Sequence, residues 1–189
     1  KIINKIKYKF EFIDLGGGIG ISYQNKEKKF NYKKYNKAIK KFLKKHNCKI
    51  IFEPGRSIIG SAGILVSKVI YIKQNKTKNF VIMDAAMNDF MRPALYGSKH
   101  KIIPVNKMNK IIKKKYEFVG PICESTDKFL TTKNFQKLSE NDYLIICDVG
   151  AYGSSLSSNY NVRPKPAEIL VKGSKISIIK KRQKLNDLI

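Results

Sequence analysis

The sequence is poor in the residues that mark several common kinds of protein. It has 3 cysteines (Cys48, Cys123 and Cys147), an odd number without CxxC spacing. This count argues against a disulfide framework or a zinc site and is typical of a reducing cytosol. No apolar run is long enough to span a membrane, and the chain starts without an initiating Met or a signal peptide. We therefore expect a fragment of a longer, soluble, cytoplasmic protein with no membrane partner.

Acidic residues are scarce, because 14 Asp and Glu stand against 39 Lys and Arg, for a formal net charge of +25. Such an excess is compatible with nucleic-acid binding, since lysine-rich surfaces attract phosphate backbones. The lysines are spread through nearly every segment, however, rather than gathered on one helix or loop. We interpret lysine as the default surface residue and expect no nucleic-acid partner, with a basic nucleic-acid-binding protein kept as an alternative.

Arginine and histidine are rarer still. Arginine occurs at Arg56, Arg92, Arg163 and Arg182, and the first three lie in segments rich in glycine or proline. Because a guanidinium offers planar, bidentate donors that lysine lacks, arginine in these segments indicates anion recognition. The two histidines, at positions 46 and 100, are expected to be surface residues, and the serines near residue 155 have no histidine partner for hydrolase chemistry.

The first sixty residues alternate between strand, loop and helix patterns. Strands are predicted over 7–15 and 48–52, and an amphipathic helix over 31–46. This order predicts the closing part of an α/β barrel, in which reactive residues lie at the carboxyl ends of strands. Residues 16–20 (GGGIG) and 53–56 (EPGR) both occupy such a position. The glycines suit either a phosphate cradle or a tight turn, and their spacing is not the dinucleotide fingerprint.

After residue 61 the pattern changes to short strands separated by polar turns. Strands are predicted over residues 63–73, 79–84, 101–105, 117–119, 142–148 and 168–171, with a short helix over 182–189. We therefore predict an antiparallel β-barrel or sandwich domain over residues 61–189, after an α/β barrel end over 1–60.

Three polar segments of the second half stand out as candidate site loops. Residues 119–129 (VGPICESTDKF) place Cys123, Glu124 and Asp127 close together after a Gly-Pro pair. Such a turn suits a pocket in which a thiol moves a proton and a carboxylate holds a cation. Arg92 and Tyr96 interrupt the apolar run 84–96, and Tyr152 lies between glycines, which allows close approach to a flat ligand.

Five segments resemble, in order, the signature blocks of the diaminopimelate decarboxylase family: DLGGGIGISY, EPGRSIIG, DAAMNDFMRPALYG, VGPICESTD and GAYGSSLSSNYNVRPKPAE. The resemblance runs over essentially the whole chain. It implies the carboxy-terminal end of a pyridoxal-phosphate-binding TIM-type barrel with an alanine-racemase-like fold, followed by a β domain. It also implies a homodimer with shared active sites, which decarboxylates meso-2,6-diaminopimelate to L-lysine and carbon dioxide, the last step of lysine biosynthesis.

The same resemblance implies roles for individual residues and no metal ligands. The residues implied to bind pyridoxal 5'-phosphate are Gly16, Gly17, Gly18, Glu53, Pro54, Gly55, Arg56 and Tyr152. The residues implied to bind the substrate are Arg56, Arg92, Tyr96, Glu124 and Tyr152. Glu53 is expected at the pyridine nitrogen, where it keeps the ring protonated as an electron sink. Cys123 is expected to be catalytic and to protonate the carbanion from the neighbouring subunit.

Some alternatives stay open beside this assignment. Ornithine and arginine decarboxylases carry a similar Cys loop but generally lack the MRPALY block, and a non-catalytic relative could keep the fold. Ala86 and Thr126 stand where the family commonly has glycine. The lysine that forms the Schiff base is expected upstream of residue 1. The chain alone is therefore expected to be inactive.

Overall fold

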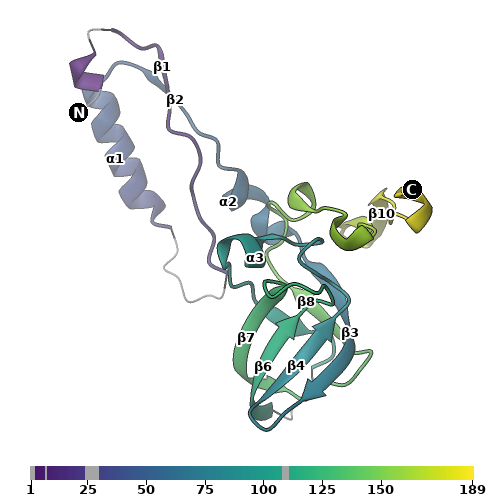
Figure 1. Ribbon diagram of the computed structural model, residues 1–189. Coiled ribbons are helices and arrows are strands. Elements are labelled where there is room, and N and C mark those ends of the chain that lie inside the picture. The colour runs from purple at the N-terminus through teal and green to yellow at the C-terminus, as the bar shows by residue number, and fades with distance from the viewer. Residues whose placement is uncertain (1–2, 7, 24–29, 108–110) are drawn as a thin grey trace.

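The computed structural model describes residues 3–6, 8–23, 30–107 and 111–189. An extended amino-terminal arm leads through two short helices to a strongly curved six-stranded sheet (Figure 1). A separate hairpin projects from the sheet near the carboxyl terminus (Figure 1). The prediction of an α/β barrel end followed by a β domain is confirmed, and the domain boundary near residue 60 stays a prediction.

The arm has the predicted strand–loop–helix–strand order. It contains β1 (Phe12–Asp14), α1 (Tyr32–Lys45) and β2 (Lys49–Ile51), and the two strands pair in parallel. The helix begins after Asn31, whose side-chain oxygen accepts a hydrogen bond from the Lys34 N–H at 2.9 Å, as a helix N-cap does. The first strand is much shorter than predicted, and residue 7 lies outside the described residues.

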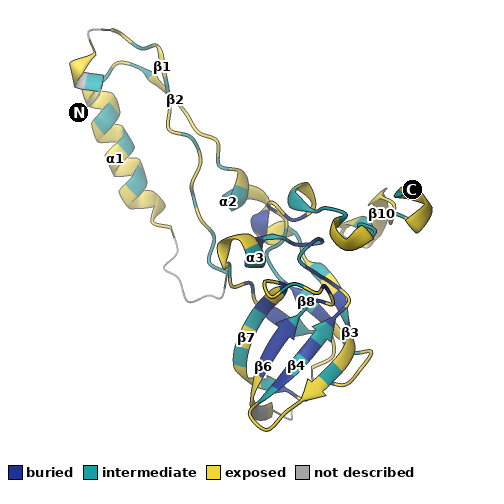
Figure 2. Cartoon of the chain, viewed as in Figure 1, coloured by how far each residue is buried: buried dark blue, intermediate teal, exposed yellow. Residues whose placement is uncertain are grey.

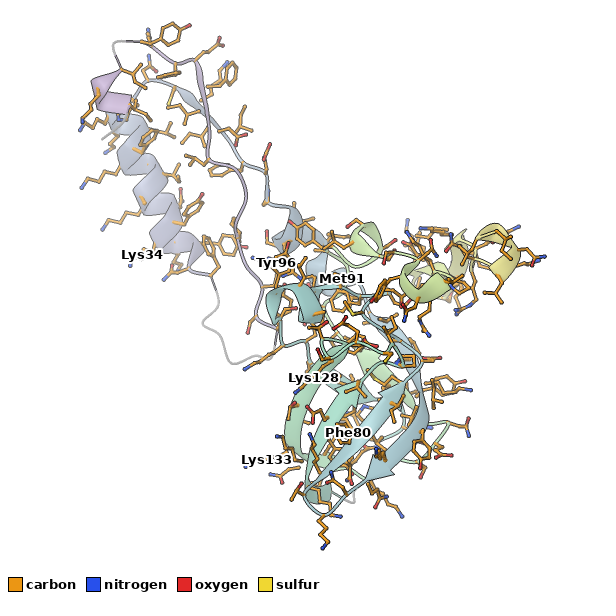
Figure 3. The ribbon with its side chains drawn as sticks, viewed as in Figure 1. Lys34, Phe80, Met91, Tyr96, Lys128 and Lys133 are labelled. Atoms are coloured by element: carbon orange, nitrogen blue, oxygen red, sulfur yellow. The ribbon has the colours of Figure 1, made fainter. Side chains whose placement is uncertain are left out.

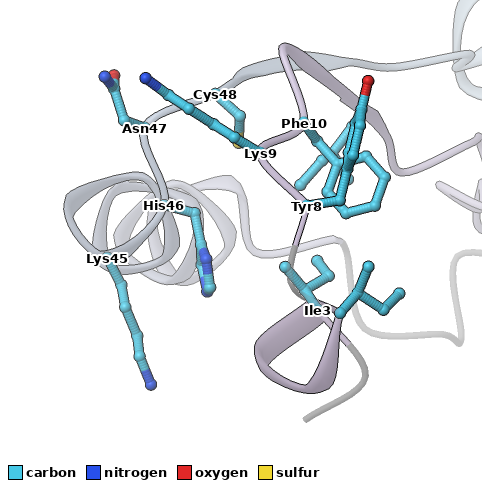
Figure 4. Close-up of a pocket in the computed structure, with 10 residues that line it drawn as sticks. Ile3, Tyr8, Lys9, Phe10, Lys45, His46, Asn47 and Cys48 are labelled. Carbon is cyan, nitrogen blue, oxygen red and sulfur yellow. The ribbon is translucent and has the colours of Figure 1, made fainter.

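The arm leaves its apolar side chains uncovered (Figure 2). The helix α1 contains no buried residue, and Tyr8 and Phe12 remain 70% and 48% exposed. A hollow of about 450 Å³ lies at the far end of the arm. The residues that line it include Ile3, Tyr8, Phe10 and His46 (Figure 4). Parallel strands are normally covered on both faces, so this arm needs further strands or helices to bury its apolar residues.

The six-stranded sheet has the order β5-β8-β3-β4-β6-β7. Its strands are β3 (Leu65–Gln74), β4 (Lys78–Met83), β5 (Ile102–Pro104), β6 (Ile111–Val119), β7 (Lys128–Gln136) and β8 (Tyr143–Ile146). The predicted hairpin is confirmed as the antiparallel pair β3–β4. The strands of this sheet pair antiparallel, as predicted, except at one place, where β4 and β6 pair in parallel. A parallel pair needs a long crossover, and here the crossover carries α3 (Arg92–Tyr96) and β5.

The remaining elements are short. The helix α2 (Gly55–Ile59) and a 3-10 turn (Gly60–Ala62) join the arm to the sheet. Strands β9 (Glu168–Lys172) and β10 (Lys175–Lys180) form the projecting hairpin, and the expected terminal helix is a single 3-10 turn (Leu185–Asp187). Further 3-10 turns are Ile3–Lys5, Ser154–Leu156 and Tyr160–Val162.

A hydrophobic core fills the curved sheet (Figure 2). Its fully buried members include Val69, Met83, Phe90, Phe118 and Leu144. The β domain is therefore a folded unit of its own, on which the loops at one end of the sheet are fixed. No helix within residues 3–6, 8–23, 30–107 and 111–189 is both long and apolar enough to cross a membrane.

An acid-sensitive charge cluster crosses three strands of this sheet. Glu117 on β6 pairs with Lys78 on β4 at 2.6 Å and with Lys128 on β7, and these hydrogen bonds lower the pKa of Glu117. A lowered carboxyl pKa stabilises the fold above the unfolded-state pKa, and this stability is lost as the pH falls through the folded-state value.

We expect Glu117→Gln to reduce the free energy of unfolding by about 1 kcal/mol at pH 7 and to have little effect near pH 3. Urea denaturation of the chain between pH 3 and pH 7 measures this difference. Glu140→Gln is the matched control, because Glu140 is exposed and makes no ion pair in the part of the chain that is described. An equal loss of stability at both pH values would contradict the assignment.

Candidate active site

The glycine loop and the Glu53 loop lie against each other at the carboxyl ends of β1 and β2. The Glu53 N–H donates to the Gly16 carbonyl at 2.9 Å, and a Cβ on Gly17 would collide with the Glu53 carbonyl oxygen. Gly16 and Gly18 have φ angles of +64° and +82°, a backbone conformation that favours glycine. The residue types of this loop therefore follow from a tight turn and a close backbone approach.

Within the described chain, some hydrogen-bonding groups of these loops are already paired, and others are left to bind a ligand. The Gly16 N–H donates to the Asp14 carboxylate at 2.7 Å, whereas the N–H groups of Gly17 and Gly18 have no partner in the described chain. The Glu53 carboxylate is exposed and likewise has no hydrogen-bond partner there. Pro54 precedes α2 and Gly55 begins it, so the Glu53–Arg56 turn leads directly into that helix.

Gly60 marks the place where three predicted site segments meet. A Cβ at Gly60 would lie 2.7 Å from Ile21 of the glycine segment, 3.6 Å from Arg56 and 3.8 Å from Ala151. Hydrogen bonds from Val149 to Gly63 and from Gly150 to Gly60, both 2.9 Å, hold the Tyr152 loop against the segment after α2. Tyr152 itself has a φ of +61°. Its side chain is exposed, so it lies at the edge of this junction.

Arg92 lies in the middle of a cluster of tyrosines. Its guanidinium carbon lies 5.2 Å from the ring centre of Tyr96, 5.3 Å from that of Tyr152 and 5.9 Å from that of Tyr23. Guanidinium groups are attracted to the faces of aromatic rings at such distances. Figure 3 shows Tyr96 and Met91 at opposite ends of α3, above the end of the sheet where Lys128 begins β7.

Neither Arg92 nor Arg56 has an acidic partner among the residues described. Arg92 is only 7% exposed, and its Nε makes no hydrogen bond. Arg56 donates to the Tyr23 hydroxyl at 3.5 Å. Arg163 differs, because it pairs with Asp89 at 3.7 Å and donates to the Asn88 side chain at 3.0 Å. A buried guanidinium without a counter-ion is costly, so Arg92 in particular favours an anionic ligand.

Two members of this cluster were not anticipated from the sequence. Tyr23 contacts both arginines, although in the sequence it is only the last residue of the block DLGGGIGISY. The expectation that His100 is a surface residue is wrong, because it is 1% exposed and packs between the rings of Tyr23 and Phe90. Burial lowers the pKa of His100 to about 4, and the charge of Arg92 contributes to this shift.

The Cys123 turn is built around a buried carboxylate. Asp127 accepts hydrogen bonds from the Met87 N–H at 2.8 Å and from the Ile122 N–H at 2.9 Å. Burial raises the pKa of Asp127, while these two bonds act in the opposite direction. The expectation of a pocket-facing carboxylate is therefore wrong for Asp127, which organises the turn. Cys123 remains exposed, and within the described chain the Glu124 carboxylate accepts hydrogen bonds only from its neighbours Ser125 and Thr126.

The predicted site residues thus form two groups. The structure brings together the glycine loop, Glu53, Arg56, Arg92, Tyr96 and Tyr152 through the junctions at Gly17, Gly60 and Tyr23. Cys123 and Glu124 make no hydrogen bond, ion pair or ring contact with this cluster within the described ranges. Among those residues, no group of three or more His, Cys, Asp or Glu side chains could hold a metal ion.

Comparison with known proteins identifies the family. The description "Pyridoxal-dependent decarboxylase, C-terminal sheet domain" applies to a family whose pattern matches residues 12–150. The chain belongs to this pyridoxal-dependent decarboxylase family. Curated relatives called diaminopimelate decarboxylase include one from Zymomonas mobilis, 42% identical over 98% of this chain, and one from Helicobacter pylori (strain J99), 46% identical over 94%.

A solved member of the family has the same fold. The crystal structure of the Helicobacter pylori diaminopimelate decarboxylase complexed with L-lysine superimposes with a TM-score of 0.85 and 45% identity over 94% of this chain. This chain covers 43% of that structure and 44% of each of the two curated relatives. The chain therefore spans less than half the length of the relatives it matches.

Proposed function

We propose that the chain is the carboxy-terminal part of a pyridoxal-phosphate-dependent decarboxylase that acts on meso-diaminopimelate. The observation that carries the proposal is the nearly buried Arg92, which has no carboxylate partner in the described chain and lies beside Tyr23, the residue that Arg56 contacts. Two guanidiniums can bind one carboxylate through charge-assisted, bidentate hydrogen bonds. Diaminopimelate has a carboxylate at the end remote from the reaction, whereas ornithine does not.

The cofactor loops fit pyridoxal phosphate by their chemistry. The free N–H groups of Gly17 and Gly18 suit a phosphate, and the free Glu53 carboxylate can hold a proton on the pyridine nitrogen. When bound, the cofactor acts as an electron sink for the bond that loses carbon dioxide. The close approach of Gly17 to the Glu53 backbone fixes the distance between the loop that binds the phosphate and the loop that binds the pyridine nitrogen.

The substrate-binding groups follow from charge. Arg56, Arg92 and Tyr96 bind the distal carboxylate, and Tyr152 borders both cofactor and substrate. Glu124 pairs with the distal ammonium, and Cys123 supplies the proton that replaces the departing carbon dioxide. Because Cys123 and Glu124 make no hydrogen bond, ion pair or ring contact with the arginine cluster in the described chain, we propose that they serve the site of a second copy in a homodimer.

Replacement of Gly17 by alanine is expected to weaken pyridoxal-phosphate binding about 10-fold, because the added Cβ forces the Glu53 loop away. Gly20→Ala is the matched control, since its Cβ would lie an ordinary 3.9 Å from Arg56. Fluorescence titration with pyridoxal phosphate measures the affinity of each variant for the cofactor. Equal affinities for the two variants would contradict the assigned cradle.

The experiment that tests the function uses a completed protein. In it, the part of the Helicobacter pylori relative that precedes the matched region is joined to residues 1–189. We expect this completed protein to release carbon dioxide from meso-diaminopimelate, and residues 1–189 alone to release none. No release by the completed protein would overturn the proposed function. Release by residues 1–189 alone would show that the reaction does not require a Schiff-base lysine upstream of residue 1.

A further inference from the structure

Tyr23 connects two arginines that come from different parts of the fold. Its hydroxyl accepts a hydrogen bond from Arg56 Nη1 at 3.5 Å, and its ring centre lies 5.9 Å from the guanidinium carbon of Arg92. Arg56 belongs to α2 after the arm, whereas Arg92 begins α3 on the β domain. Tyr23 is therefore placed to set the separation of the two guanidiniums.

His100 supports Tyr23 from the side of the β domain. The two ring centres lie 4.3 Å apart, and Phe90 contacts the imidazole edge to face at 4.6 Å. The His100 Nδ1 lies 2.9 Å from the Cys147 carbonyl oxygen. Because a carbonyl only accepts hydrogen bonds, this contact assigns the proton to Nδ1 and fixes the ring orientation. At neutral pH the ring is uncharged, since burial lowers its pKa to about 4.

Buried polar atoms without partners gather in the segments that meet at this pair. Four of the five such atoms among the described residues lie there: Ser22 Oγ, next to Tyr23, Arg92 Nε, Ser98 Oγ and His100 Nε2. The fifth, Asn79 Oδ1, lies on β4. Buried polar atoms in native proteins nearly always have partners, so each of these atoms calls for an explanation, and a functional role is one.

We propose that Tyr23 and His100 form a positioning pair that fixes Arg56 and Arg92 relative to each other and thereby sets the recognition of the substrate's distal carboxylate. The inference rests on the proposed function. His100 acts through Tyr23, and Tyr23 acts through the two arginines. Neither residue exchanges a proton with the substrate.

The first test compares two ligands that differ by one carboxylate. L-lysine keeps the carboxylate that corresponds to the distal end of diaminopimelate, and cadaverine has the same carbon chain and amines without it. In the completed, cofactor-loaded protein, Tyr23→Phe is expected to raise the Kd of L-lysine about 10-fold and to leave the Kd of cadaverine unchanged. Calorimetric titration measures both. An equal change for the two ligands, or no change for either, overturns the positioning role.

The second test asks whether the two residues act together. His100→Phe keeps an aromatic ring between Tyr23 and Phe90 but removes the hydrogen bond to Cys147. We expect it to raise the KM for meso-diaminopimelate about 10-fold with kcat changed less than about 2-fold, and the double variant to resemble either single variant. Additive effects overturn the pair. If the proposed function is wrong, the unsubstituted completed protein releases no carbon dioxide, while the ligand comparison still decides the role of Tyr23.

Discussion

Arg92→Ala is expected to lower kcat/KM for meso-diaminopimelate by about 10²- to 10³-fold in the completed protein, because it removes one partner of a nearly buried charge-assisted contact. Arg92 is 7% exposed and has three tyrosine rings around its guanidinium. Within the described chain nothing acidic neutralises it, so its charge is available to the substrate carboxylate. Steady-state kinetics with a coupled carbon dioxide assay measure the effect.

The stability of the same variant separates binding from folding. Since Arg92 is held away from water and no described residue supplies a counter-ion, its removal is expected to leave the free energy of unfolding unchanged or to raise it. Arg92→Lys keeps the charge without the bidentate fork and should recover activity only in part. Arg182→Ala is the matched control, because Arg182 is exposed and far from the tyrosine cluster in sequence. A loss of activity that follows a loss of stability would contradict the account.

Asp127→Ala is expected to have the largest effect on stability, about 2–4 kcal/mol. The substitution leaves the N–H groups of Met87 and Ile122 without their acceptor, and both lie in loops at the site end of the sheet. The residue that packs directly against the Asp127 carboxylate is Gly120. Because glycine has no side chain, it cannot fill the space that the alanine variant leaves. Activity should fall as well, because the turn carries Cys123 and Glu124.

Two controls define what Asp127 does. Asp127→Asn keeps one acceptor oxygen and should lose less stability than the alanine variant. Ser125→Ala alters the same turn at an exposed residue whose hydroxyl makes only a 3.4 Å contact with Glu124. Urea unfolding measures all three variants. If Asp127→Ala and Ser125→Ala were equally stable, the carboxylate would not organise the turn.

The elements predicted well from the sequence are those set by local patterns. The apolar spacing and Asn31 cap define α1, and alternating apolar residues define the β3–β4 hairpin. The strand β7 was missed because its sequence, KFLTTKNFQ, mixes polar residues on both faces. The parallel β4–β6 pair was missed for another reason. It depends on a crossover of nearly thirty residues, for which no local pattern exists.

In the candidate site, too, residues marked by a local pattern could be predicted, and residues defined by long-range contacts could not. The glycine loop, Glu53, Arg56, Arg92, Tyr96 and Tyr152 could be proposed from the sequence because their residue types are unusual for their segments or match a family motif. Tyr23 and His100 could not be proposed in this way, because the contacts they make join segments far apart in the sequence. Asp127 was misjudged for a related reason. A carboxylate in a polar turn has the same sequence pattern whether it faces a ligand or accepts backbone hydrogen bonds inside the protein.

The central claim is that two guanidiniums, neither of which pairs with an acidic residue in the part of the chain described, recognise a carboxylate at the far end of the substrate. The most direct measurement is the ratio of kcat/KM for meso-diaminopimelate to that for ornithine in the completed protein. A site that leaves buried charged groups unpaired rejects the shorter substrate strongly, so we predict a ratio of at least about 10³. A ratio near one, or a preference for ornithine, would contradict the account.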